Sequence, residues 1–404
     1  MAEIVRPRDA QGVADALAWA AAEGEPMEVV GAGTKRGLGH GIAAPRVLDL
    51  TGLSGITDYE PEELVLTAAA QTPIAEIEAM LRQKNQQLSF EPPDFGPLLG
   101  APAEHATLGG VIAANLSGPR RIKAGAARDN FLGLQAVTGR GEAVKAGGRV
   151  VKNVTGYDVM KLLAGSYGTL AVLTEISVKV LPAAEKTRTV LVAGLDAPTA
   201  VDVLGATLSS PHDVSAAAFL PAAHAQRSSV SYVSGSGASV TAIRLEGPPA
   251  STATRMAAIK DMVADHGAIE ELHGMNSGTL WREIRDAARL LGGDMVWRLS
   301  VPPAGGGSLF DTMTRDGRLS GFLDWGGGLI WLVGAADRDM ALAIRSAANE
   351  AGGHATLMVA PDALKAEIPV FHPQPAERFR LTRRIKEGFD PRAVLNPGRM
   401  YPGV

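Results

Sequence analysis

Three glycine-rich stretches in the first half of the chain have the composition of backbone sites for an anionic ligand. The first is VVGAGTKRGLG (29–39), the second is ATLGGVIAANLSG (106–118) and the third is GSYGTLAVLTE (165–175). Glycine lets backbone N–H groups approach a phosphate closely, and a hydroxyl group such as that of Thr34 adds a further donor. Three such stretches in one region are explained better by a shared ligand than by three unrelated turns.

The first stretch does not fit the two best-known nucleotide loops. A dinucleotide-binding turn needs a third glycine that opens a helix. That position is Arg36 here, and Gly37, Gly39 and Gly41 disfavour a following helix. A nucleoside-triphosphate loop needs Gly-Lys-Ser/Thr, which is absent. A pyrophosphate loop without a helix and a plain glycine turn remain as interpretations of this stretch taken by itself.

Composition narrows the class of protein. With 404 residues, of which 46% are hydrophobic, the chain is long enough for two or three domains. It has no cysteine, which excludes disulfides, a cysteine nucleophile and a cysteine-ligated iron–sulfur cluster within this chain. A net charge of −4 gives no global basic field for nucleic acid. Without a signal-like start or a membrane-length apolar run, we expect a cytoplasmic protein.

Hydrophobic periodicity predicts an α+β fold whose strands and helices position these stretches. In the first part we expect a helix from Asp9 to Gly24, strands at 27–30, 47–50, 64–67, 131–137 and 168–180, and a helix opening at Thr72. Residues 183–375 alternate strand-like stretches (189–192, 295–301, 329–333) with Ala-rich helices (251–265, 337–350). A basic helix is predicted at 376–386, before Leu395-Asn396-Pro397-Gly398.

The three stretches, in this order and followed by LNPGR (395–399), resemble the vanillyl-alcohol-oxidase type (PCMH-type) of FAD-binding family. That family has a glycine loop, then T-x-G-G, then G-x-x-G-T-L-G-V-x-T-E, and it ends in L-N-P-G-K/R. The likeness implies an FAD-binding domain at 1–182, a smaller α+β cap or substrate domain at 183–375, and a C-terminal segment, 376–404, that returns to the FAD domain. The run KNVTGYD (152–158) through Leu181-Pro182 resembles the flavin subunits of bacterial glycolate oxidases.

The resemblance also implies which residues bind FAD. The pyrophosphate would be held by Gly31, Ala32, Gly33, Thr34 and Lys35. Pro93 and Asp94 would lie near the adenine end. The diphosphate and ribityl chain would be flanked by Thr107, Gly109, Gly110, Asn115 and Ser117. The flavin would be approached by the backbone of Gly165, Gly168, Thr169 and Leu170, and by Asn396 from the C-terminal segment. Relatives with covalent flavin carry a histidine in the pyrophosphate loop; His40 lies beyond it, so non-covalent FAD is expected.

The second domain departs from the metal-dependent members of the family. Those carry H-x-G-D-G-N-x-H, whose histidines bind a metal. The matching run here is DWGGGLIW, with Asp324 and Trp331 at the histidine positions, so we expect no catalytic metal. The G-E-H-G stretch of these relatives is also missing around His354. Arg298 is the candidate catalytic residue, because its guanidinium suits a carboxylate. A salt bridge within the second domain is its alternative role, and His354 and His372 fit ordinary turn or surface positions.

The family likeness implies an FAD-containing subunit of a glycolate (2-hydroxy acid) oxidase complex. Its expected partners are a small 2-hydroxy acid, a second flavin subunit and an iron–sulfur subunit, since a chain without cysteine needs a partner for onward electron transfer. Peripheral association with the inner membrane would occur through those partners, and no nucleic acid is expected. Two alternatives stay open: a non-catalytic structural or regulatory subunit with a vestigial flavin fold, and a stand-alone flavin-dependent alcohol oxidase.

Overall fold

The computed structural model describes residues 2–148 and 157–404, so most of the run 152–158 lies outside the described residues. The chain forms two compact units. Unit 1 comprises Met1–Ser117, Gly125–Ala183 and Pro373–Val404, and unit 2 comprises Gly118–Ala124 and Ala184–His372. The short segment Gly118–Ala124 thus groups with unit 2, whereas the sequence placed it in the FAD-binding domain. The division into domains at 182 and 375 stays a prediction.

A small parallel sheet in unit 1 carries the first glycine stretch. Strand β3 (Arg46–Asp49) lies between β1 (Glu3–Val5) and β2 (Met27–Val30) and pairs with both in parallel. The C-terminal segment runs beside β2, because Met27 N donates to Val394 O and Asn396 N donates to Met27 O. The turn that begins at Gly31 therefore starts next to Asn396.

The second sheet of unit 1 is antiparallel and holds the strand that follows the third glycine stretch. Its order is β4 (Ile56–Glu60), β5 (Val65–Ala69), β9 (Ala171–Lys179), β7 (Phe131–Thr138) and β8 (Ala143–Gly147). A third sheet has only β6 (Gln86–Gln87) and β10 (Leu181–Pro182). The helices and 3-10 turns of unit 1 are α2 (Ile74–Arg82), η1 (Pro97–Leu99), α3 (Leu108–Ala113), η2 (Ala127–Asp129), α5 (Val159–Leu163) and α14 (Ala376–Phe389).

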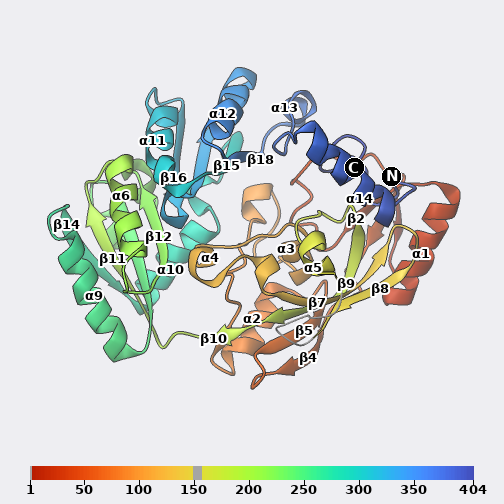
Figure 1. The fold of residues 1–404 in the computed structure, drawn as a ribbon, viewed down its shortest axis with the longest axis horizontal. Helices are drawn as coiled ribbons and strands as arrows, with labels where there is room; N and C mark the ends of the chain where they lie inside the picture. The colour runs from red at the N-terminus through yellow and green to blue at the C-terminus, as the bar shows by residue number, and fades with distance from the viewer. Residues whose placement is uncertain (1, 149–156) are drawn as a thin grey trace. The chain divides into compact units, whose positions relative to one another are not determined.

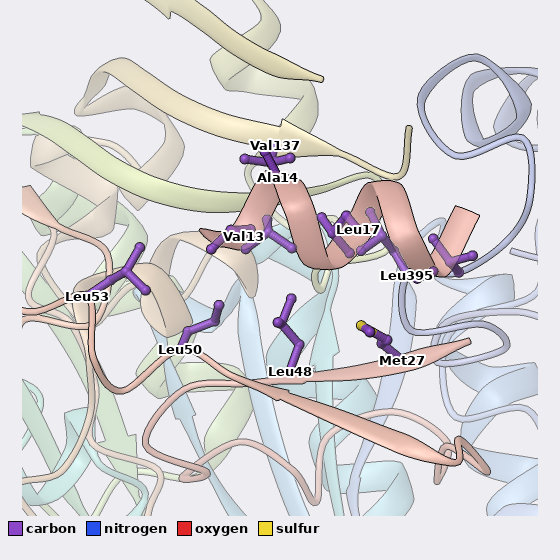
Figure 2. Close-up of a cluster of buried hydrophobic side chains, with 12 residues drawn as sticks. Val13, Ala14, Leu17, Met27, Leu48, Leu50, Leu53, Val137 and Leu395 are labelled. Atoms are coloured by element: carbon purple, nitrogen blue, oxygen red, sulfur yellow. The ribbon is translucent and has the colours of Figure 1, made fainter. Parts of the chain in front are cut away.

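Helix α1 (Ala10–Glu23) covers the parallel sheet, and local signals set both of its ends. Asp9 accepts a hydrogen bond from Gly12 N at the start, and Gly24 ends the helix at φ 69°. Its apolar side packs on β2, β3 and the C-terminal segment, as Figure 2 shows. The buried side chains drawn there include Val13, Leu17, Met27, Leu48 and Leu395. This core fixes the positions from which the first glycine turn and the C-terminal segment depart.

Unit 2 is built on an eight-stranded antiparallel sheet (Figure 1). Its order is β14 (Ala268–His273), β11 (Lys186–Ala193), β13 (Val240–Gly247), β12 (Val214–Leu220), β16 (Leu319–Asp324), β17 (Leu329–Gly334), β15 (Met295–Ser300) and β18 (His354–Val359). The helices are α4 (Arg121–Ala124), α6 (Ala197–Leu208), α7 (Ala222–Ala225), α8 (Ser231–Ser234), α9 (Pro249–Val263), α10 (Gly274–Arg285), α11 (Pro303–Thr314), α12 (Arg338–Glu350) and α13 (Asp362–Glu367), with 3-10 turns η3 (Ala288–Leu290) and η4 (Trp325–Gly327). Helices and sheets occur in both units, which confirms the α+β class. Over the part of the chain that is described, no helix is both long and apolar enough to cross a bilayer.

Candidate functional site

All three glycine stretches meet at one pocket within unit 1. The pocket encloses about 800 Å³ of space, which includes space open to solvent. Ten of the residues predicted to bind the cofactor line it: Gly31, Ala32, Gly33, Thr34, Lys35, Thr107, Gly109, Gly110, Gly168 and Asn396.

The first stretch forms a turn whose backbone donors are available to a ligand. Among the described residues, no acceptor is found for the N–H groups of residues 31–35. Gly33 has φ 77°, a value that favours glycine. A Cβ at Gly31 would lie 1.9 Å from Gln71 Oε1, so the first glycine of the turn makes room for a neighbouring side chain. Consecutive N–H groups in such a turn form an anion-binding concavity.

The second stretch begins a short helix beside this turn. Thr107 caps α3 by accepting from Gly110 N (3.3 Å), and its hydroxyl donates to Gln71 Oε1 (3.1 Å). A Cβ at Gly109 would approach Ala70 O to 2.7 Å. Gly109 is therefore required by the packing of α3 on the end of β5, independently of a ligand.

The third stretch is held in an uncommon backbone conformation by the C-terminal segment. Tyr167 and Gly168 have φ of 53° and 70°, and Asn396 has φ 44°. Asn396 Nδ2 donates to Tyr167 O (2.9 Å) and to Gly168 O (3.4 Å), and Asn396 Oδ1 accepts from Val29 N (2.8 Å). The amide of Asn396 thus connects β2 to the third glycine stretch while the residue itself lines the pocket.

Basic side chains make the pocket suitable for an anion. Lys35 donates to Thr34 Oγ1 (3.2 Å), and burial lowers its pKa to about 8 although the negative charge of Asp94 acts in the opposite direction. Arg399 also lines the pocket, and burial lowers its pKa. Arg36 pairs through its guanidinium with both carboxylate oxygens of Glu28. A bound phosphate group would relieve the cost of keeping Lys35 and Arg399 charged in this place.

Seven predicted cofactor residues do not line the pocket found in the described residues: Pro93, Asp94, Asn115, Ser117, Gly165, Thr169 and Leu170. Several of them bond to the backbone instead. Asp94 accepts from Gly96 N and Glu104 N, Asn115 from Arg128 N, and Ser117 from Ala127 N. Contacts of these seven residues with FAD stay predictions.

Sequence reasoning missed some pocket residues. Gln71, Tyr167 and Arg399 line it as well. Arg399 stands at the end of the LNPGR motif, which was a usable signal. Gln71 follows β5 without any motif, and only the three-dimensional structure brings it beneath Gly31.

Unit 2 gathers a second set of basic groups around Trp325. The guanidinium carbons of Arg121 and Arg298 lie 4.3 and 5.0 Å from the centre of its indole ring. The indole Nε1 donates to Gly118 O (3.1 Å). Ser300 of β15 pairs with His354 of β18, and desolvation together with the charges of Arg298, His372 and Arg121 lowers the pKa of His354.

The DWGGGLIW run (324–331) includes the turn between the paired strands β16 and β17. Asp324 is buried and accepts from Trp325 N (2.7 Å), and Trp331 is buried in β17. Within residues 2–148 and 157–404, no group of three or more His, Cys, Asp and Glu side chains could hold a metal ion. The expected absence of a catalytic metal stays a prediction.

Comparisons with known proteins identify the family. A family model described as FAD binding domain matches residues 1–147. Glycolate oxidase subunit GlcE from Escherichia coli (strain K12) is 34% identical over 380 residues, covering 93% of this chain and 93% of that protein. This chain belongs to the GlcE family of glycolate oxidase subunits. The FAD-binding domain expected from the sequence is confirmed.

Other proteins are similar to this GlcE-family chain over a shorter length or at lower identity. Glycolate oxidase subunit GlcD from Bacillus subtilis (strain 168) is 34% identical over 163 residues, 40% of this chain and 32% of that protein. Among solved structures, 4-ethylphenol oxidase from Gulosibacter chungangensis has a TM-score of 0.73 at 14% identity, covering 99% of this chain and 89% of that one. p-Cresol methylhydroxylase has a TM-score of 0.68 at 15% identity, covering 98% and 88%. These structures confirm the vanillyl-alcohol-oxidase (PCMH-type) fold.

The residues of the pocket fit FAD. The turn at 31–35 offers backbone donors, Lys35 and Arg399 offer positive charge, and the rest of the lining is largely backbone and small side chains. His40 does not line the pocket in the described structure, and its backbone N–H donates to Arg399 O. Non-covalent attachment of FAD stays a prediction.

Proposed function

We propose that this chain is the FAD-containing subunit of an oxidase complex that converts glycolate, a 2-hydroxy acid, to glyoxylate. The observation that carries the proposal is the extent of the likeness to GlcE. It covers 93% of the chain and so includes unit 2, whereas the likeness to GlcD covers 40%. A shared FAD-binding domain alone would be compatible with many substrates.

Within the pocket, the chain's own residues would hold the cofactor at its diphosphate. The N–H groups of residues 31–35 and the ammonium group of Lys35 would contact the pyrophosphate, with Arg399 as a further cation. The turn at Tyr167–Gly168 and Asn396 would stand at the flavin end. FAD, when bound, supplies the acceptor for the hydride that leaves the hydroxylated carbon of the substrate.

Oxidation of a 2-hydroxy acid also requires a cation for the carboxylate and a base for the hydroxyl proton. In unit 2, Arg298 and Arg121, which both lie near the Trp325 ring, are our candidates for holding the carboxylate. Desolvation and then the charge of Arg298 lower the pKa of His354, which favours the neutral imidazole, the form that can accept a proton. We propose these roles for the three residues, and Arg298 is the first to test.

Electrons must then leave through partners. The chain has no cysteine and therefore no thiolate ligands for an iron–sulfur cluster. We propose a second flavin subunit and an iron–sulfur subunit as partners, in a cytoplasmic complex that associates peripherally with the inner membrane through them. The relatives named as glycolate oxidase subunits GlcE and GlcD support an assembly of several chains.

A second candidate function is an FAD-binding subunit that does not itself oxidise substrate. Asp324 and Trp331 stand where the metal-dependent relatives have histidines, and this replacement favours it. Each missing catalytic group typically costs on the order of 10²–10⁴ in rate. We therefore expect the isolated chain to react slowly with glycolate.

Anaerobic stopped-flow measurement of flavin reduction by glycolate tests these alternatives. The isolated chain should be reduced far more slowly than the assembled complex turns over, and Arg298→Met should raise the glycolate concentration needed for half-maximal rate in the complex. Arg318→Met is the matched control, because Arg318 is exposed and pairs with Asp316. Reduction of the isolated chain at the full rate of the complex would identify a stand-alone oxidase. A flavin of this subunit that glycolate never reduces, even in the complex, would identify the non-catalytic alternative.

A further inference from the structure

An ion pair lies in the interior of unit 1, between Lys386 of α14 and Asp390, the residue that caps the C-terminus of this helix. Lys386 Nζ is 2.7 Å from Asp390 Oδ2, and the exposed fractions of the two side chains are 3% and 0%. The sequence predicted Lys386 only as the last residue of a basic helix at 376–386. Its burial sets it apart from the arginines that precede it, which are exposed.

The ammonium group of Lys386 and both carboxylate oxygens of Asp390 are held by hydrogen bonds. Besides Asp390, Lys386 Nζ donates to Thr169 O (2.7 Å) and to Leu395 O (2.9 Å), which accounts for the three N–H groups of an ammonium. Asp390 also accepts from Val394 N (3.0 Å) and Leu395 N (2.8 Å). The pair therefore joins three segments: α14, the third glycine stretch and the C-terminal segment.

Stability is a poor explanation for such a pair. Burying two charges costs several kcal/mol per ion, and well-packed apolar replacements are often as stable or more stable. The same helix has a matched pair with the same spacing, Arg383 and Glu387, which is 3.4 Å apart and exposed. Exposed pairs of this kind contribute little. What distinguishes the buried pair is the set of backbone groups that it holds.

Those backbone groups flank the flavin end of the pocket. Thr169 follows Tyr167 and Gly168, which line the pocket in left-handed conformations, and Leu395 precedes Asn396, which bonds to the carbonyl groups of both. A left-handed tyrosine costs free energy and persists only where its surroundings enforce it. Asn396 supplies one constraint on this turn, and Lys386 supplies a second one through Thr169 O and Leu395 O of the same two segments.

We propose that Lys386 and Asp390 are positioning residues for the flavin site, holding the 166–169 turn and residues 395–396 in the spacing that FAD binding requires. The inference rests on the proposed binding of FAD in this pocket. It adds that a charged pair, which does not line the pocket in the described structure, sets both the affinity for FAD and the surroundings of the ring.

The test replaces both charges at once in the full-length chain, so that neither is left buried without its partner. The double variant Lys386→Met/Asp390→Leu is compared with Arg383→Met/Glu387→Leu on the exposed side of the same helix. Three quantities are measured: the melting temperature without FAD, the Kd for FAD by fluorescence titration, and the visible absorption spectrum of the bound flavin. We expect a melting temperature within roughly 4 °C of wild type, a Kd raised about tenfold or more, and shifted absorption maxima. The control variant should match wild type in all three.

A double variant that folds and keeps the wild-type Kd and spectrum would overturn the inference. If the double variant does not fold, Lys386→Gln decides, since an amide of similar reach can still donate to carbonyl groups. Weakened FAD binding by a folded Lys386→Gln protein supports a positioning role, and wild-type binding contradicts it. Loss of folding in both variants would show that the pair serves stability instead. Failure of the wild-type chain to bind FAD would count against the proposed function. This result differs from FAD binding by wild type that the double variant leaves unchanged, which would count only against the positioning role.

Discussion

Replacing Lys35 with methionine removes the buried cation of the proposed pyrophosphate loop. Burial lowers the pKa of this lysine from an ordinary 10.5 to about 8, so an ammonium group at this position is unfavourable in the protein without FAD. The two phosphates of FAD would favour the charged form and raise the pKa again. If binding restored the ordinary pKa, the pKa difference of about 2.5 would correspond to about 3.4 kcal/mol, or about three-hundredfold in Kd.

The sign of the pH dependence follows from this linkage. Below pH 8 the amine is already protonated in the protein without FAD, so wild-type affinity should be at its full value. Above pH 8, binding must take up a proton, and affinity should fall by up to about tenfold per pH unit until the pH reaches the pKa of the complex. Lys35→Met should bind FAD about three-hundredfold more weakly at pH 6.5 and without this pH dependence, so the Kd values of the two proteins should converge at alkaline pH.

Titration of the FAD-free proteins with FAD, followed by quenching of flavin fluorescence between pH 6.5 and 9.5, measures both effects. Lys84→Met is the control, because Lys84 is exposed on the surface of the same unit. Lys35→Arg should restore affinity without the fall above pH 8, since a guanidinium stays protonated. Wild-type affinity in Lys35→Met at pH 6.5, or a flat wild-type profile across the range, would refute the assignment of Lys35 to the pyrophosphate.

The other predictions concern the cofactor, the metal and the core. Gly33→Val should lose FAD while keeping its fold, because Gly33 has a φ of 77°. Gly41→Ala is the control and should retain the flavin, since the space around the new Cβ is open. Equal flavin content in the two variants would contradict the assignment of the loop. Acid precipitation should release all FAD into the supernatant, and yellow colour in the pellet would indicate a covalent bond. Elemental analysis should find no stoichiometric transition metal, and a metal whose removal by chelators abolishes activity would count against the reading of Asp324 and Trp331. Leu17→Ala, in the core shown in Figure 2, should lower the free energy of unfolding by about 2–5 kcal/mol. Leu381 is exposed, so Leu381→Ala should change this free energy by less than about 0.5 kcal/mol. Urea denaturation measures both.

The sequence predicted well those features that depend on interactions between residues close together in the chain. Helix α1 runs between the residues expected, because Asp9 and Gly24 act on their own neighbours. Strand β2 ends where its apolar run meets the first glycine of the turn. The first glycine stretch lines the pocket from Gly31 to Lys35 for the same reason: consecutive residues of one turn share one location.

Long-range pairing is what the sequence could not predict. Lys386 and Thr169 are 217 residues apart, and no periodicity of α14 distinguishes a lysine that points inward from the arginines around it. Asn115 and Ser117 were assigned to the cofactor because they follow T-x-G-G, yet their side chains accept from the backbone of Arg128 and Ala127. A polar side chain in a cofactor motif has two candidate partners, the ligand and the nearby backbone, and the motif does not say which one it contacts.

The glycines of the DWGGGLIW run (324–331) are required by the backbone itself. Gly326 and Gly327 have φ of 64° and 98°, and a Cβ at Gly327 would approach Pro303 O to 2.8 Å. The turn between β16 and β17 therefore needs glycine whether or not a metal is bound. Asp324 accepts from Trp325 N, and the guanidinium carbons of Arg121 and Arg298 lie 4.3 and 5.0 Å from the centre of the Trp325 ring. The backbone requirement therefore accounts for these glycines without any reference to a metal. The same reasoning applies to Gly109, which packing on Ala70 requires, so evidence for FAD binding must come from Gly33, Lys35 and the N–H groups that no other residue explains.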